Sequence, residues 1–161
     1  MQLLFVCLGN ICRSPTAHGV FQRKLEWAGL DRQVTVDSAG TGAWHIGNDP
    51  DPRTQAAARV RGYDLSHLRA RQTGPSDFER FDYILAMDRD NLHHLERMKP
   101  ADYKGHLGLF LDFAVGAQVR EVPDPYYSDG GGGNDGFEQV LDLIEEASDG
   151  LLDEIQRRLA P

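Results

Sequence analysis

Cys7 and Arg13 lie near the amino terminus with five residues between them, and their side chains could act together on a phosphate ester. A cysteine thiolate is a strong nucleophile, and a helix N-terminus beside an arginine lowers the pKa of such a thiol. The planar guanidinium of arginine can bind two oxygens of one phosphate. The pair is therefore suited to in-line attack on phosphorus, which gives a phosphocysteine intermediate and requires no metal.

The residues around this pair have the pattern of a turn between a strand and a helix. Leu3–Val6 is apolar throughout, as in a central parallel strand, and the small residues Gly9-Asn10 follow as a turn. Ser14 as N-cap and Pro15 as first helical residue predict a helix that runs to Ala28. Consecutive amide groups in such a turn form an anion-binding nest, to which the helix dipole adds positive charge. Neither G-K-[ST] nor G-x-G-x-x-G is present, so the two nucleotide-binding fingerprints do not fit.

Segments typical of strands and of helices alternate along the rest of the chain. This alternation predicts one α/β domain over residues 1–161, with an open parallel sheet and a loop over 38–50. Gly150 inside the last helix is expected to cost about 1 kcal/mol, which packing of the apolar face offsets. The further strands are expected at Val34–Val36, Tyr83–Met87 and Leu107–Leu111, and the further helices begin at Pro52, Asn91 and Phe137.

The charge of the chain excludes two classes of partner. Its 17 Lys and Arg against 25 Asp and Glu give a net charge of −8. Residues 1–80 carry 10 basic and 8 acidic side chains, a balance of +2, whereas residues 81–161 carry 7 and 17, a balance of −10. We therefore expect no nucleic acid partner and no attraction to an anionic membrane. A small anion bound by local donors is compatible with this balance.

The two cysteines are too few for a disulfide scaffold, which predicts a reducing, cytoplasmic setting. The amino-terminal apolar run is too short for a signal sequence or a membrane span. Cys12 has two interpretations, a packing residue or a resolving thiol for an oxidised Cys7. His93 and His94 are adjacent and would face different sides of a helix, so neither a metal site nor another cofactor is expected.

The segment from Cys7 to Pro15, CLGNICRSP, resembles the active-site loop of the low-molecular-weight protein tyrosine phosphatases. The resemblance extends over the whole chain, and it implies a single-domain four-stranded parallel sheet with helices on both faces. It also implies metal-independent hydrolysis of phosphotyrosine in proteins and of small aryl phosphates. Inorganic phosphate would then be both product and competitive ligand. The other segments that carry the resemblance are 37–41, 51–53, 81–88 and 124–127.

The resemblance also implies a general acid, because a tyrosyl oxygen needs a proton when it leaves. Asp124 stands where the family carries this acid, and the prolines on either side would hold its carboxylate in a stiff loop. The same carboxylate would then deprotonate the hydrolytic water. Without the resemblance, Asp-Pro is a common turn that does not single out Asp124 among the 17 carboxylates of this half.

Two further sets of side chains follow from the family pattern. A polar shell is expected to hydrogen-bond to the loop, although without the family His67 would be a surface or core histidine. Aromatic side chains are expected to wall the cleft around the phenyl ring. Ile11 points toward phosphotyrosine, since relatives with Thr in its place act on phosphoarginine. The shell is Asn10, Ser14, Ser38 and His67; the substrate-binding residues are Leu8, Gly9, Asn10, Ile11, Cys12 and Ser14, with Trp44, Tyr126 and Tyr127 as walls.

Three other functions compete with this one. Related arsenate reductases share the fold and the loop, but they pass oxidation to cysteines near the middle of the chain, where this sequence has none. A non-catalytic phosphate-binding module would not need nucleophile, clamp and acid together. A thiol redox sensor built on Cys7 and Cys12 could coexist with catalysis. The chain departs from the family at Gly130–Gly133, which either lets the acid loop move more or is a surface expansion.

Overall fold

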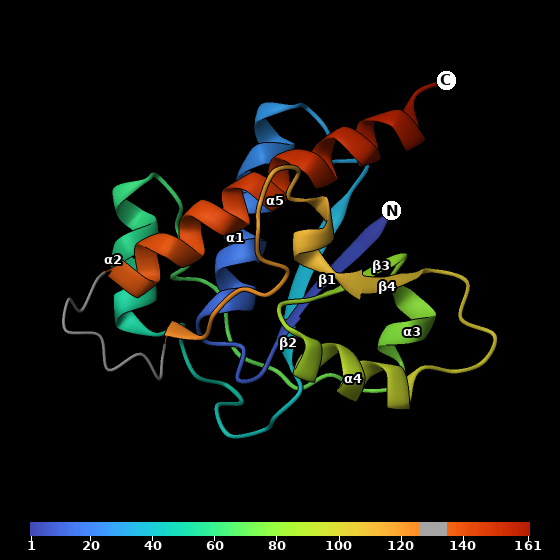
Figure 1. Ribbon diagram of the computed structural model, residues 1–161, viewed down its shortest axis with the longest axis horizontal. Coiled ribbons are helices and arrows are strands. Elements are labelled where there is room, and N and C mark those ends of the chain that lie inside the picture. Colours follow the sequence, from blue (N-terminus) through green and yellow to red (C-terminus); the bar gives the residue numbers. More distant parts are fainter. Residues whose placement is uncertain (126–134) are drawn as a thin grey trace.

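Four parallel strands form the central layer of the computed structural model, which describes residues 1–125 and 135–161 (Figure 1). The strands are β1 (Gln2–Cys7), β2 (Thr35–Gly40), β3 (Tyr83–Ala86) and β4 (His106–Leu109). Their order across the sheet is β2-β1-β3-β4, so β1 has β2 on one side and β3 on the other.

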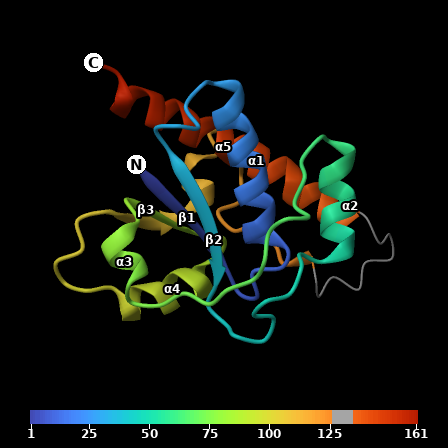
Figure 2. The same ribbon diagram turned by 180° about the vertical axis from the view of Figure 1, so that it is seen from behind.

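Helices cover both faces of the sheet (Figures 1 and 2), which confirms the predicted fold class. On one face lie α1 (Arg13–Trp27) and α5 (Asp135–Leu159), and on the other lie α3 (Asp77–Arg80) and α4 (Arg89–Met98). Helix α2 (Pro52–Val60) packs beside α5. The short helix α3 was not among the expected elements.

Strand β1 is buried on both faces, as its unbroken apolar sequence predicted. Leu3 and Phe5 belong to the core beneath α1 and α5, whereas Leu4 and Val6 belong to the core on the side of α3 and α4. All four side chains are fully buried. At roughly 2 kcal/mol for each buried apolar side chain, this packing fixes where the strand ends and where the following loop begins.

Helix α1 starts with a cap different from the expected one. Cys12 is the N-cap and makes no capping bond with its side chain. The prediction that Ser14 caps the helix is wrong, because its hydroxyl contacts Cys7 and Asn10 of the preceding turn and the carbonyl of Ala39. The Ser14 side chain therefore stabilises the turn before α1 and does not cap the helix.

Strand β2 is longer than predicted, since Ser38–Gly40 belongs to the strand and not to the following loop. Gly40 allows a close approach between two backbones. A Cβ there would lie 2.7 Å from the carbonyl oxygen of Leu8 and 3.0 Å from the carbonyl carbon of Gly9. The end of β2 therefore lies directly against the turn that follows β1.

Gly150 in α5 contacts η1 (Phe110–Phe113), the 3₁₀ turn that replaces the end of the strand expected at Leu107–Leu111. A Cβ on Gly150 would lie 1.8 Å from the carbonyl oxygen of Phe113. The close packing of α5 on η1 therefore requires a glycine at this position.

Some of the expectations concern residues 126–134. Tyr126, Tyr127 and Gly130–Gly133 lie outside the described residues. Within the described ranges, no helix combines the length and the apolar character that a membrane span needs.

Candidate active site

The residues from Cys7 to Ser14, called the phosphate loop below, lie at the carboxyl-terminal edge of the sheet between β1 and the first turn of α1. Strand β2 lies on one side of β1 and strand β3 lies on the other side. The direction in which successive strands are added to the sheet therefore reverses at β1. Ligands of open α/β sheets bind at such a place. The loop therefore has the position expected of an anion-binding turn.

The Cys7 thiol is buried at the base of the phosphate loop, with 3% of the residue exposed. Its Sγ accepts a hydrogen bond from the amide of Asn10 at 3.3 Å and lies 3.1 Å from the hydroxyl oxygen of Ser14. That hydroxyl has one proton, which can go to Sγ or to the carbonyl oxygen of Ala39 at 3.3 Å. A thiolate at Cys7 would thus receive two hydrogen bonds, which stabilise its charge.

Two carbonyl oxygens of the phosphate loop accept hydrogen bonds from neighbouring segments. The carbonyl of Leu8 accepts from the amide of Gly42 at 2.9 Å, and the carbonyl of Ile11 accepts from the amide of Asp51 at 2.8 Å. Within the described part of the chain, the amides of Gly9 and Ile11 donate to no other group. These donors are available to an anion, as an anion-binding nest requires.

The guanidinium of Arg13 is buried behind the loop and held by three acceptors. Its Nη1 donates to Asp88 Oδ2 at 2.6 Å and to the carbonyl of Val122 at 3.1 Å, and its Nη2 lies 3.4 Å from Asp124 Oδ2. Burial opposes the charge, but Cys7 and the two carboxylates outweigh it and raise the pKa of Arg13 above its ordinary value. Arg13 is therefore a fixed cation with a set orientation.

Asp88 joins the phosphate loop to helix α4, and sequence reasoning did not select it. Its Oδ1 accepts from the amide of Asn91 as the N-cap of α4, while Oδ2 accepts from Arg13. The signal that could have found Asp88 is its place two residues after the buried strand β3, at the same edge of the sheet as Cys7 at the end of β1.

Asn10 is the turning point of the phosphate loop and the one non-glycine residue with positive φ, +57°, among the described residues. Its Nδ2 donates to Ser14 Oγ at 2.7 Å, and its Oδ1 accepts from the amide of Arg71 at 3.0 Å. Arg71 in turn pairs with Asp37 at 3.0 Å and Asp77 at 3.1 Å. Arg71 was also missed, because it lies 61 positions from Asn10 and nothing near it in sequence marks the contact.

Ser38 and His67, the other members of the expected polar shell, lie beside His18 on α1. Ser38 Oγ is 3.1 Å from His18 Nδ1. His67 is exposed and lines, together with His18, a cavity of about 460 Å³. Burial lowers the pKa of His18 to about 4, with His67 adding to the shift and Asp37 opposing it. Among the described contacts, neither Ser38 nor His67 hydrogen-bonds to the phosphate loop, whereas Asn10 and Ser14 do.

Cys12 and Ile11 form a small apolar cluster with Ala70 and Phe137, which packs the phosphate loop against the start of α5. Burial raises the pKa of the Cys12 thiol to about 12, so this thiol is neutral near pH 7. Buried thiols of this kind are chemically inert. The cluster accounts for Cys12 as a packing residue, and its role as a resolving thiol for an oxidised Cys7 stays a prediction.

Trp44 is the one predicted wall residue within the described ranges, and 71% of it is exposed. Its ring lies over Gly42, where a Cβ would come within 1.8 Å of a ring carbon. Gly42 donates to the carbonyl of Leu8, so the exposed indole stands next to the phosphate loop. The ring of His45 lies over Gly9, where a Cβ would be 2.9 Å from His45 Cδ2. This position suits a wall of the cleft, and the role of Trp44 stays a prediction.

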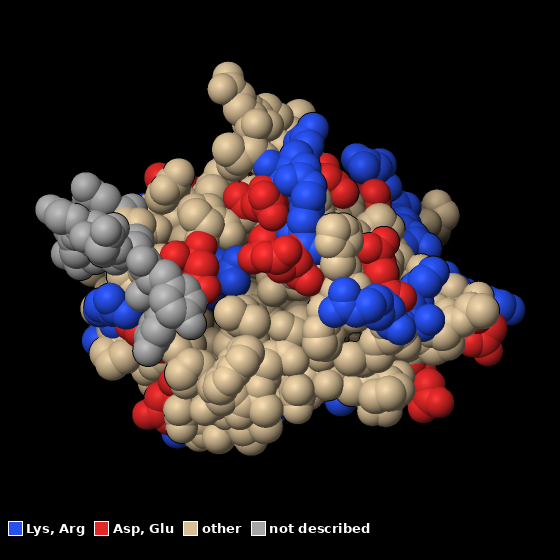
Figure 3. All heavy atoms as spheres, turned by 60° about the horizontal axis from the view of Figure 1, so that its bottom comes forward, with Lys and Arg blue, Asp and Glu red and all other residues tan. Residues whose placement is uncertain are grey.

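One face of the molecule carries side chains of both signs of charge. In Figure 3 the lower side of Figure 1 comes forward, and acidic and basic side chains alternate around the middle of that face. Attraction for a phosphate must therefore come from local donors, the loop amides and Arg13, as the uneven charge of the two halves indicated.

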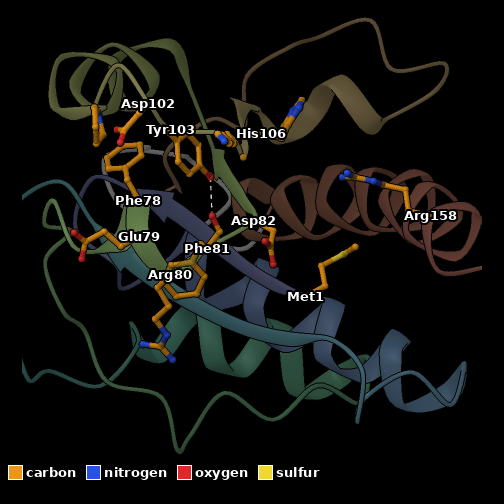
Figure 4. A pocket seen from close by; sticks show the side chains of 13 residues that line it. Met1, Phe78, Glu79, Arg80, Phe81, Asp82, Asp102, Tyr103, His106 and Arg158 are labelled. Carbon is orange, nitrogen blue, oxygen red and sulfur yellow. Dashed lines mark hydrogen bonds between the residues drawn. The ribbon is translucent and has the colours of Figure 1, made fainter.

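A cavity of about 970 Å³ lies at the opposite end of the sheet, near the amino-terminal ends of the strands (Figure 4). Met1, Phe81 and His106 are among its lining residues, and Cys7, Arg13 and Asp124 are not. No cluster of three or more His, Cys, Asp or Glu side chains in the described ranges could hold a metal ion. The residues with the predicted chemistry, Cys7, Arg13 and Asp124, lie at the phosphate loop.

Comparisons with known proteins identify relatives over nearly the whole chain. Residues 2–160 match the family model described as low molecular weight phosphotyrosine protein phosphatase. A protein of that name from Schizosaccharomyces pombe is 46% identical over 156 residues, which cover 96% of this chain and 97% of the relative. The crystal structure of a protein tyrosine phosphatase from Entamoeba histolytica with Hepes in its active site has a TM-score of 0.92 at 40% identity, covering 99% of each chain. An arginine phosphatase from Drosophila has a TM-score of 0.89 at 30% identity, covering 97% of this chain and 98% of its own.

Proposed function

Since the chain belongs to the low molecular weight phosphotyrosine protein phosphatase family, we propose that Cys7, Arg13 and Asp124 carry out the hydrolysis of phosphotyrosine in proteins and of small aryl phosphates. One observation carries this assignment. The Cys7 thiol lies between two hydrogen-bond donors at the base of a loop whose free amides and buried arginine can bind a phosphate. The proposed phosphatase domain is the whole chain, residues 1–161.

In the first step, the Cys7 thiolate attacks phosphorus and forms an S–P bond while the bond from phosphorus to the tyrosyl oxygen breaks. Arg13 and the loop amides bind the non-bridging oxygens, where charge develops. The carboxyl group of Asp124 donates its proton to the departing oxygen, so that tyrosine leaves as the neutral phenol. The 3.4 Å contact between Asp124 Oδ2 and Arg13 Nη2 supports this role, because it brings the carboxyl group next to the arginine that would bind the phosphate.

In the second step, the Asp124 carboxylate takes a proton from a water molecule, whose oxygen attacks phosphorus. The S–P bond breaks, the thiolate of Cys7 is restored, and inorganic phosphate is released. Since the product fits the same donors as the substrate, it should also inhibit competitively. The hydrogen bonds from Asn10 and Ser14 favour this step, because they stabilise the leaving thiolate.

Substrate choice is assigned to phosphotyrosine on the basis of Ile11 and Trp44. The apolar Ile11 side chain takes part in the cluster with Phe137. The exposed indole of Trp44 offers a flat face for a phenyl ring. A panel of phosphotyrosine and phosphoarginine peptides tests this assignment. Faster turnover of phosphoarginine would place the chain with relatives such as the Drosophila arginine phosphatase.

The test of the mechanism is hydrolysis of para-nitrophenyl phosphate in EDTA by the wild type and by Cys7→Ser. We expect metal-independent turnover by the wild type and none by Cys7→Ser, and robust turnover by Cys7→Ser would refute the mechanism. Trapping of phosphate on Cys7 during turnover distinguishes the enzyme from a phosphate-binding module. Thiol-dependent reduction of arsenate, measured alongside, tests the reductase alternative.

The setting of the protein is proposed from the same site. Both cysteines are free thiols in the structure, and a thiolate nucleophile requires reducing conditions. These features support a cytoplasmic location. We propose phosphotyrosine-containing proteins as partners, and the net charge of −8 argues against a nucleic acid or an anionic membrane as partner.

A further inference from the structure

The residues that lead into Asp124 are attached to the start of helix α4. Residues 121–124, called the acid segment below, run beside Met87, Asp88 and Arg89, which connect β3 to this helix. Glu121 and Val122 each form hydrogen bonds with that connection, and both lie within three residues of the proposed acid. The position of the Asp124 carboxyl group therefore depends on these contacts.

Glu121 binds Arg89 through both of its carboxylate oxygens. Oε2 accepts from the backbone amide of Arg89 at 2.8 Å, and Oε1 lies 3.2 Å from Arg89 Nη1. Arg89 is the first residue of α4, so its amide is one of the donors that have no partner within the helix. A carboxylate at this end of a helix is also favoured by the helix dipole.

Val122 continues the attachment one residue closer to Asp124. Its amide donates to the carbonyl of Met87 at 2.8 Å, its carbonyl accepts from Arg13 at 3.1 Å, and its side chain is 1% exposed. The backbone of Val122 is thus held between Met87, in the connection from β3 to α4, and Arg13. Glu121 is the residue directly before Val122 in the chain.

We propose that Glu121 is a positioning residue for the general acid, acting through its bond to the backbone amide of Arg89. The inference rests on the proposed role of Asp124 as the acid. Glu121 does not touch substrate in this arrangement; it holds the acid segment so that the Asp124 carboxyl group faces the departing oxygen. Its function requires an acceptor oxygen at the Arg89 amide and not the ion pair with the Arg89 side chain.

The relative importance of the two contacts follows from their exposure. The side chains of Glu121 and Arg89 are 44% and 54% exposed, and ion pairs between such groups contribute little. The bond to the Arg89 amide satisfies a helix donor and links two segments of backbone. Arg89→Ala keeps this amide and removes only the ion pair, which makes it the matched control.

The experiment measures kcat/KM, which covers the steps up to release of the phenol, for phenyl phosphate and for 2,4-dinitrophenyl phosphate. Phenyl phosphate needs the acid, and dinitrophenyl phosphate does not, because its leaving group is a stable anion. We expect Glu121→Ala to lower kcat/KM about tenfold for phenyl phosphate and less than about twofold for dinitrophenyl phosphate. Glu121→Gln, which retains an acceptor, and Arg89→Ala should both stay within about twofold of the wild type for both substrates.

The double variant Glu121→Ala/Asp124→Ala separates this inference from the proposed function. If Glu121 acts through Asp124, the double variant should be no slower on phenyl phosphate than Asp124→Ala alone. Additive losses, or an equal loss on both substrates in Glu121→Ala, would overturn the inference. A loss in Asp124→Ala that does not depend on the leaving group would instead refute the acid role itself. Melting temperatures of all variants identify a general loss of folding, and Glu121→Gln decides the outcome if Glu121→Ala is unstable.

Discussion

The phosphate loop and the acid segment meet at Arg13, and both are bonded to residues far away in the chain, but among the described contacts the loop also has hydrogen bonds within itself. Within the loop, Cys7 and Asn10 both bond to Ser14, so its internal bonds span at most seven positions. The acid segment is held by bonds to residues at least 32 positions away in the chain. A motif of local contacts can be recognised in sequence, whereas a segment held by distant contacts cannot. Variants at the contacts of each region test this difference.

Arg13→Lys should have the largest effect, because Arg13 lies in the phosphate loop and also contacts Val122 and Asp124 of the acid segment. Lysine keeps the charge but cannot reach Asp88, Val122 and the phosphate with one planar group. We expect kcat/KM for para-nitrophenyl phosphate to fall roughly 10³-fold. The comparison is Arg23→Lys, a change on the exposed face of α1. A loss below about fivefold would show that charge alone is sufficient.

Asp88→Asn tests the contact between Arg13 of the phosphate loop and Asp88 at the start of α4. Asparagine can still accept from the amide of Asn91, so the helix cap remains, but the charged partner of Arg13 is lost. We expect kcat/KM to fall roughly 30-fold, since Arg13 is then oriented only by the weaker contacts with Val122 and Asp124. Asp90→Asn, two residues along the same helix and exposed, should match the wild type. An equal effect of the two variants would argue against an orienting role for Asp88.

Two substitutions of Asn10 distinguish the effect of its backbone conformation from the effect of its side-chain hydrogen bonds. Asn10→Gly and Asn10→Ala both lose the bonds to Ser14 and to the Arg71 amide, so each should reduce kcat/KM about tenfold. Glycine tolerates the φ of +57°, and alanine does not, so the alanine variant should be less stable by about 1 kcal/mol. Urea denaturation measures this difference, and equal stabilities would mean that the backbone relaxes.

His18→Gln should have the smallest effect on activity and should show instead in the dependence of stability on pH. The pKa of His18 is about 4 in the folded protein against 6.5 for an ordinary histidine, so protons bind preferentially to the unfolded chain. This stability is present above pH 6.5 and is lost as the pH falls toward 4. His18 is half-buried, so we expect the wild type to lose about 1 kcal/mol through this group between pH 7 and pH 5. Urea denaturation at the two pH values should show that His18→Gln lacks this part of the loss, and an unchanged profile would contradict the assignment.

Local patterns were sufficient to predict most of the fold. The apolar run of β1, the Cys7–Pro15 motif and the spacing of apolar residues in α5 each indicated an element that the structure contains. Boundaries were less certain where a tertiary contact decides them. Gly40 extends β2 because of a close approach to Leu8, and Ser14 bonds to the loop instead of capping α1.

The site was predictable to the extent that its contacts are local. Cys7, Asn10 and Arg13 follow from one short motif, but Asp124 depended on resemblance because an Asp-Pro turn has no distinguishing local signal. Arg71 and Asp88 were missed because their partners lie 61 and 75 positions away. Ser38 and His67 lie beside His18, an arrangement that depends on how α1 packs and not on any motif.

The close approach at Gly40 has a consequence for how this enzyme tolerates sequence change. A methyl group there would come within 3.1 Å of three backbone atoms of residues 8–10, and none of these can turn away as a flexible side chain could. In a saturation library selected for activity, position 40 should therefore be as depleted of variants as position 7, although it contributes no reactive group. Position 40 would then be intolerant to substitution because the loop needs the space, whereas position 7 would be intolerant because its thiol reacts.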